Sequence, residues 1–221
     1  MAHTRGSGSP PAERKRGRIL IPRPGSRVYL LAVKPSPIVE HDHIDGPADA
    51  PVTVIEYGDY ECPYCVKAFP VLEQVRQAYG KQLRFVFRHV PKSGHAFDKQ
   101  AAEASEFAAA HGKFWPMHAQ LFALEGRHDL EQLVAAAAAV GLDAGQCRKA
   151  LLERSFAERV RELSIAALHS GIIGTPTVFI NDVRYENRLE EPLLRAHRPR
   201  ARGSRQLLTP TAANGLSRGV R

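Results

Sequence analysis

One stretch, from Glu56 to Pro70, constrains the fold of this 221-residue chain more than any other. It reads EYGDYECPYCVKAFP and continues the β-branched run PVTVI, so a short buried strand leads directly into two cysteines and a helix. We expect the helix to run from Cys62 to Tyr79. Its apolar residues gather on one side, Pro63 falls in the first turn and Gly80 ends it.

The next segment, LRFVFR at residues 83–88, alternates in the manner of a second strand. A right-handed crossover through the helix would make the two strands parallel. Pro70 lies inside the expected helix and should kink it, because proline removes a backbone donor there.

The pattern then changes twice along the chain. From about residue 96 to residue 170 no strand signal appears, and we expect four or so helices separated by glycines. The segment GTPTVFI, residues 174–180, is a turn followed by a strand, and Asn181-Asp182 predicts a tight hairpin into residues 183–185. The sequence therefore predicts an α/β fold with a mixed central sheet and an all-helical insertion.

The paired cysteines admit three chemical interpretations. A structural zinc site needs four ligands, and the only other cysteine is Cys147, alone in a helical stretch. A permanent disulfide across so small a loop would remove little entropy from the unfolded chain. A cysteine at a helix N-terminus, however, faces unpaired N–H groups and the positive end of the helix dipole, which favour its thiolate. We therefore expect an exposed, nucleophilic Cys62 and a core-facing Cys65 that resolves the mixed disulfide.

Two further positions acquire roles near this dithiol. Glu56 is a carboxylate in an apolar strand. Burial there would raise its pKa and let it exchange a proton with Cys65. The alternative is that Glu56 simply lies on an exposed edge of the sheet. Pro176 directly precedes a strand, where a cis bond after Thr175 would leave backbone groups free to pair with an extended substrate beside Cys62.

Four segments, EYGDYECPYC, FVFRHVP, HGKFW and GTPTVFIN, together resemble the DsbA-like branch of the thioredoxin superfamily, from about His43 to Tyr185. The resemblance implies a thioredoxin fold with an inserted helical subdomain and thiol–disulfide exchange with protein substrates. It implies no bound cofactor or metal. The catalytic residues would be Cys62, Cys65 and Glu56, and the substrate-facing ones would be Pro63, Tyr64, Thr175 and Pro176.

One departure from the strongly oxidising members of that branch lies between the cysteines. Pro63-Tyr64 stands where those members have Pro-His, and tyrosine offers no cation to stabilise a thiolate. The sequence thus predicts a less oxidising couple, in the reductase or isomerase direction. Two other functions stay open: a glutathione-dependent transferase or isomerase of the same superfamily, and a chaperone-like binding module without enzymatic activity.

The net charge of +8 belongs to the two ends of the chain. Residues 1–37 carry eight basic residues and one acidic residue, and residues 187–221 carry eight basic and two acidic residues. The part between them carries fifteen basic and twenty acidic residues. We expect disordered basic tails at 1–37 and 198–221 that flank fold segments 38–95, 96–170 and 171–197. A closing helix begun by Leu189 and Leu193 looks truncated.

The tails predict no specific nucleic-acid partner, because they interleave no aromatic residues with their arginines. The apolar run at residues 28–33 is too short for a spanning helix or a secretory core. As written, the sequence predicts a cytoplasmic protein, or a periplasmic or other extracytoplasmic one if the true N-terminus differs.

The tract His41-Asp42-His43 suggests a metal only weakly, and His89 could approach the dithiol. The redox partner is unidentified.

Overall fold

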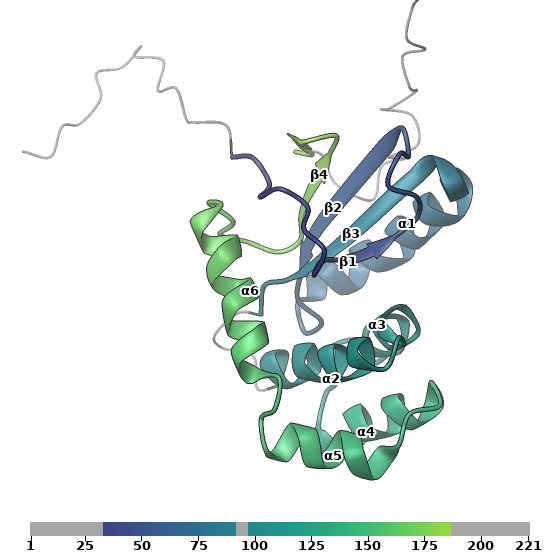
Figure 1. Cartoon of the computed structure of the whole chain (residues 1–221), viewed down its shortest axis with the longest axis vertical. Helices are drawn as coiled ribbons and strands as arrows, with labels where there is room; N and C mark the ends of the chain where they lie inside the picture. The colour runs from purple at the N-terminus through teal and green to yellow at the C-terminus, as the bar shows by residue number, and fades with distance from the viewer. Residues whose placement is uncertain (1–32, 92–96, 187–221) are drawn as a thin grey trace, which may run out of the picture. The chain divides into compact units, whose positions relative to one another are not determined.

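The computed structural model describes residues 33–91 and 97–186 (Figure 1). The expectations for residues 1–32, for the truncated closing helix and for residues 198–221 lie outside this part. In chain order the elements are β1 (His43–Asp45), β2 (Val52–Gly58), α1 (Pro63–Tyr79), the 3-10 turn η1 (Gly80–Gln82), β3 (Leu83–His89), α2 (Asp98–Ala110), α3 (Phe114–Ala123), α4 (Leu130–Ala139), α5 (Ala144–Leu152), α6 (Ala157–His169), β4 (Thr177–Ile180) and β5 (Val183–Arg184).

The strands form one mixed sheet in the order β1-β3-β2-β4-β5. β2 and β3 are parallel, as the crossover through α1 requires, whereas β4 pairs with β2 in the antiparallel sense and β5 closes a hairpin onto β4. Helices α2–α6 all lie between β3 and β4 in the sequence. The predicted α/β thioredoxin-like fold with a mixed sheet is confirmed.

Strand β1 is an element that the sequence analysis did not predict. His43 to Asp45 pair antiparallel with Phe85 to Phe87 of β3, at the edge of the sheet. Three residues are too few to show an alternating pattern, so only the pairing with β3 reveals this strand. His43 is consequently part of the central sheet.

The sheet buries both of its faces. On the face toward α1, Val54, Phe85 and Phe87 join Cys65 and Leu72 of that helix in one apolar cluster that extends into the helical insertion. A second apolar cluster covers the other face, and it includes one residue of α6. Its buried members are Ile55, Tyr57, Val86, Val90, Ala167, Ile172 and Phe179. Three partly buried residues of the segment before β2 pack against it: Val33, Ile38 and Ile44. Alternation along β2 therefore directs Glu56 toward α1.

Arg88 of β3 fastens the N-terminal segment to the sheet. Its Nε and Nη2 donate to the two carboxylate oxygens of Asp42 (2.8 and 2.6 Å), and its Nη groups also donate to the carbonyls of Ser36 and Pro37 (2.9 Å each). Nη1 reaches the hydroxyl of Tyr57 as well (2.7 Å). Residues 33–37, which the sequence analysis assigned to a tail, thus contact the folded core.

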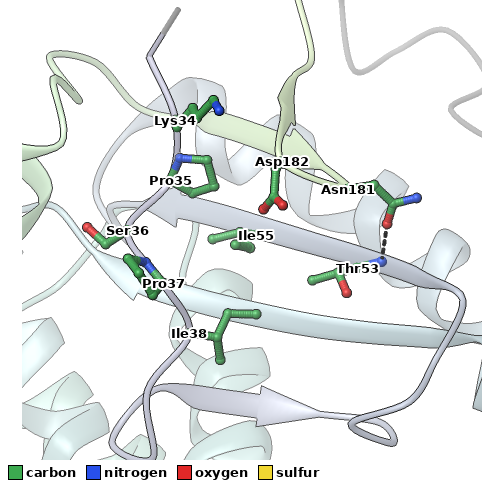
Figure 2. Close-up of a pocket in the computed structure, with 9 residues that line it drawn as sticks. All are labelled: Lys34, Pro35, Ser36, Pro37, Ile38, Thr53, Ile55, Asn181 and Asp182. Atoms are coloured by element: carbon green, nitrogen blue, oxygen red, sulfur yellow. Dashed lines mark hydrogen bonds between the residues drawn. The ribbon is translucent and has the colours of Figure 1, made fainter.

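A cavity of about 530 Å³ lies between this N-terminal segment and the start of β2 (Figure 2). Figure 2 shows Ile38 and Ile55 at its floor and the hairpin residues Asn181 and Asp182 at its rim, where Thr53 N donates to Asn181 Oδ1 (2.8 Å). Both hairpin residues have positive φ, 47° and 66°, which suits the tight turn predicted there. The cavity borders the first residues of β2, whereas the cysteines follow its last residue, so it is not the dithiol site.

Candidate active site

Cys62 is held at the start of α1 by a short turn that begins at Asp59. The Asp59 carboxylate accepts from the backbone N–H of Glu61 (2.9 Å), and the Cys62 N–H donates to the Asp59 carbonyl (3.2 Å). Cys62 itself is the N-cap residue, with extended φ and ψ of −73° and 118°, and Pro63 takes the first helical position. The Cys62 side chain therefore lies beside the unpaired N–H groups of the first helical turn.

The Cys62 thiol meets a segment far along the chain. Its Sγ donates to the carbonyl oxygen of Thr175 at 3.4 Å, and the peptide bond from Thr175 to Pro176 is cis. The Thr175 hydroxyl oxygen is buried and has no hydrogen-bond partner among the described residues. One expectation is wrong: Cys62 is only 4% exposed, because the Thr175 segment lies against it.

The surroundings of Cys62 favour its charged form. The pKa of its thiol is lowered to about 5, chiefly by a hydrogen bond from the Cys65 thiol. Burial opposes this shift, whereas the Thr175 side chain and the backbone N–H groups of Cys65 and Tyr64 add to it. The helix N-terminus thus acts through named N–H groups, as the cysteine position suggested.

Cys65 and Glu56 lie behind Cys62 in the core. Cys65 has no exposed surface, and burial raises its pKa well above the usual value; the hydrogen bond to Cys62 and the charge of Glu56 act in the same direction. Glu56 is 1% exposed, and its pKa is raised to about 8, mainly by burial. Its Oε1 has no hydrogen-bond partner among the described residues, so the alternative of an exposed strand edge is wrong.

The remaining sequence-predicted residues are neighbours of Cys62 or of Thr175 in the chain. Pro63 and Tyr64 are exposed, Tyr64 by 70% of its surface, and Pro176 is half-buried beside Thr175. Figure 1 shows how the two halves meet: α1 follows β2, and β4 lies next to β2. In the chain, the six α-helices α1 to α6 and strand β3 separate these two strands. All seven predicted site residues therefore lie in the two segments that Cys62 and Thr175 join.

Gly58 shows why β2 ends as it does. A Cβ atom there would lie 2.5 Å from a ring carbon of Phe87 and 3.3 Å from Glu56 Oε1. No side chain fits without displacing one of these groups. Gly58 thus keeps the space in which the buried carboxylate and the Phe87 ring lie together.

The sequence analysis missed a buried polar group beneath the redox turn. The Tyr60 hydroxyl and His118 Nδ1 are 3.0 Å apart, and both residues are 1% exposed. Burial raises the pKa of Tyr60 and lowers that of His118, so both stay uncharged. No local pattern links Tyr60 to a histidine 58 positions away.

Cys147 takes no part in this site. It is fully buried in α5, and burial raises the pKa of its thiol to about 11. All three cysteines are free thiols in the structure. The group of potential metal ligands found among the described residues, His43, His89 and Glu106, contains no cysteine.

Comparison with known proteins agrees with this architecture. The family model described as thioredoxin matches residues 39–196. The crystal structure of oxidised BdbD from Bacillus subtilis superposes with a TM-score of 0.66 at 26% identity, covering 73% of this chain and 92% of BdbD. A thioredoxin-like oxidoreductase from Silicibacter pomeroyi DSS-3 gives 0.57 at 29% identity, covering 65% of this chain and 82% of that one.

The fold and these neighbours define the class as DsbA-like thiol–disulfide oxidoreductases. The chain belongs to the thioredoxin family, in the DsbA-like branch of that superfamily.

Curated relatives carry a different name. The protein named Na(+)/H(+) antiporter NhaA 1 of Salinispora arenicola is 38% identical over 177 residues, which are 80% of this chain and 26% of that protein. NhaA 3 of Salinispora tropica is 40% identical over 147 residues, 66% of this chain and 22% of that protein. The chain thus spans about a quarter of the length of the curated relatives it matches.

Proposed function

We propose that this chain exchanges disulfides with the cysteines of protein substrates through Cys62 and Cys65. The observation that carries the proposal is the contact between Cys62 Sγ and the carbonyl of Thr175, with the buried Glu56 behind the pair. This contact supports the proposal because a nucleophilic Cys62 sulfur would lie next to backbone groups that an extended peptide can pair with.

In the reducing direction the Cys62 thiolate attacks one sulfur of a substrate disulfide. A mixed disulfide forms, and the other substrate sulfur leaves as a thiolate. Cys65 then loses its proton to the ionised Glu56 and attacks Cys62 Sγ. The Cys62–Cys65 bond forms, the second substrate thiolate leaves, and two electrons have passed from the dithiol to the substrate.

The oxidising direction is the reverse sequence and starts from the closed disulfide. A substrate thiolate attacks Cys62 Sγ, Cys65 leaves as a thiolate, and Glu56 in its protonated form returns the proton. A carboxyl group whose pKa is about 8 can act in both directions, because both of its forms are populated near neutral pH.

We propose a redox potential between those of thioredoxin and of the strongest oxidants. A thiolate pKa of about 5 lies between the values of ~7 and ~3.5 that accompany these two extremes. Tyr64 contributes no cation, and the backbone N–H groups supply only part of the stabilisation. Equilibration with glutathione should give a value between about −270 and −120 mV. A redox potential as high as about −120 mV would contradict the prediction that this couple is less oxidising than the strongest oxidants.

The direct test is reduction of insulin disulfides by dithiothreitol. Wild-type protein should accelerate it, Cys62→Ser should not, and Cys65→Ser should accumulate a mixed disulfide with insulin. Cys147→Ala is the matched control, because it removes a thiol that lies outside the site. Activity that survives Cys62→Ser would favour a glutathione-dependent or purely binding role.

We also propose that the chain acts next to a membrane on its non-cytoplasmic side, although the sequence by itself suggested the cytoplasm. The relatives in which the matching segment occurs are named as antiporters, which work across membranes. Among the described helices, none combines the length and apolar character of a membrane-spanning helix. Labelling by a membrane-impermeant thiol reagent in intact cells would test this, with labelling only after lysis as the contradicting result.

A further inference from the structure

Three side chains from separate elements meet beside the sheet edge. His43 comes from β1, His89 from the end of β3 and Glu106 from the middle of α2, elements that are labelled in Figure 1. One potential ligand atom of each lies within 4.8 Å of the other two. Glu106 Oε1 is 2.7 Å from His43 Nε2 and 3.3 Å from His89 Nε2. Both imidazoles therefore direct the same ring nitrogen at one carboxylate oxygen.

These separations suit a small cation with nitrogen and oxygen ligands. Zinc binds histidine nitrogen at about 2.0–2.1 Å and carboxylate oxygen at about 2.0–2.2 Å, so tetrahedral ligands lie roughly 3.4 Å apart. The distance from Glu106 Oε1 to His89 Nε2 already matches this value. The distance from Glu106 Oε1 to His43 Nε2 would have to increase by less than 1 Å. Two histidines with one carboxylate form an established ligand set for zinc with an open fourth position.

We propose that His43, His89 and Glu106 bind a divalent first-row transition-metal cation, of which Zn²⁺ is the best match. Each imidazole would bind through Nε2 and carry its hydrogen at Nδ1. Water or the second oxygen of Glu106 would fill the fourth position. A bound ion would link the edge strand β1, the sheet strand β3 and the first helix of the insertion.

Neighbouring rings hold the histidines in place. His43 stacks on Phe114 with 3.5 Å between ring centroids, and His89 meets the edge of the same ring at 6.0 Å. His89 is 1% exposed, and the Glu106 side chain is 7% exposed. A site whose ligands are fixed before the ion arrives spends little conformational entropy on binding.

Two other groups compete for these ligands. Ser105 Oγ lies 3.1 Å from His89 Nε2, and Arg159 Nε lies 3.8 Å from Glu106 Oε2. Arg159 faces Oε2, which is turned away from the histidines. Oε1 accepts from the Nε2–H groups of the two imidazoles, and an ion would replace these hydrogens as each ring moves its hydrogen to Nδ1. Ser105 already donates to the Ala102 carbonyl (2.8 Å), so its hydrogen does not occupy the lone pair of His89 Nε2.

The test is a zinc titration against a chromophoric chelator, with the dithiol oxidised to its disulfide so that Cys62 and Cys65 cannot bind the ion. We expect one zinc per wild-type chain. His43→Gln and His89→Gln should each raise the dissociation constant by at least about tenfold. The matched control is His41→Gln, two residues from His43 and exposed, which should stay within about twofold of wild type. Absence of stoichiometric binding at micromolar zinc, or equal loss in His41→Gln, would overturn the proposal.

A second measurement identifies the ligand atoms in the wild-type protein directly. Cobalt bound to the wild-type protein with its dithiol oxidised should give a spectrum of nitrogen and oxygen ligands, without sulfur-to-metal charge transfer. A sulfur signature would overturn the proposal in favour of a thiol site. Zinc should also raise the unfolding temperature of wild type and of His41→Gln, and leave that of His89→Gln unchanged.

Discussion

The thiol of Cys62 donates to the backbone carbonyl of Thr175 across 3.4 Å, although the two residues are 113 positions apart in the sequence. The pairing of β4 with β2 produces this contact, because it brings the turn before β4 to the edge where β2 leads into α1. The helices between them must return the chain to that edge. The site thus depends on the sheet and not on either segment alone.

The low pKa of Cys62 predicts how its reactivity depends on pH. With a pKa of about 5, alkylation of the reduced protein should reach half its maximal rate near pH 5, whereas a free cysteine does so near ~8.5. Mass spectrometry of the alkylated peptides measures this. Cys147 serves as the internal control and should stay unmodified in the folded protein, because it is buried and its pKa is about 11. A midpoint near 8 at Cys62 would contradict the stabilised thiolate.

The raised pKa of Glu56 predicts a pH-dependent cost to stability. The folded state keeps its proton up to about pH 8, while the unfolded carboxyl loses it near 4.5, so wild-type stability falls as pH rises through this window. Glu56→Gln removes the penalty, and at pH 9 it should be more stable than wild type by about 5 kcal/mol, which corresponds to a pKa raised from 4.5 to about 8.

Denaturant unfolding at several pH values measures that difference, which should shrink toward pH 4. Glu153→Gln, at an exposed position, is the control and should follow the wild-type curve. The same Glu56→Gln variant should slow resolution of the mixed disulfide by at least about tenfold at neutral pH, because the proton acceptor of Cys65 is lost. Unchanged resolution would leave Glu56 a purely structural residue.

Arg88 should be among the charged residues on which stability depends most. Arg88→Met leaves the Asp42 carboxylate, whose side chain is 3% exposed, without its partner, and two backbone carbonyls lose a donor. We expect a loss of about 3–5 kcal/mol in the free energy of unfolding. The control is Arg161→Gln, which breaks an exposed pair with Glu158 and should cost less than about 1 kcal/mol. Equal effects in the two variants would refute the anchoring role.

Gly58→Ala should destabilise the protein through crowding at the end of β2. The added Cβ would lie 2.5 Å from the Phe87 ring, and overpacking of this kind costs about 1–3 kcal/mol. Gly174→Ala is the comparison, since nothing lies within 4 Å of a Cβ there. Thermal unfolding of the two variants should separate them, and a neutral Gly58→Ala would show that Phe87 can move aside.

Much of the fold followed from short-range patterns. The apolar run before Glu56, the alternation at residues 83–88 and the turn at Asn181-Asp182 each predicted an element that the structure contains. These patterns are readable because burial on a strand or a helix has a fixed period. β1 was missed, since three residues carry no period.

Within the site, the order of residues along the chain determined the chemistry. A cysteine that caps a helix lies beside free N–H groups whatever the rest of the fold does, so the sequence could predict Cys62 as the nucleophile that we propose. The exposure of the Cys62 sulfur could not be predicted, because the Thr175 segment that covers it follows the helical insertion, 113 residues later in the chain. Local geometry sets the pKa, and tertiary contacts set access.

The sequence by itself determined that this chain carries a dithiol at a helix start within an α/β framework. Only the tertiary structure decided that Glu56 is fully enclosed and that Tyr60 meets His118. It also decided that His43 and His89 share one carboxylate oxygen of Glu106. The physical reason is that backbone propensity acts over a few residues, whereas burial and side-chain pairing depend on which distant segments the sheet brings together.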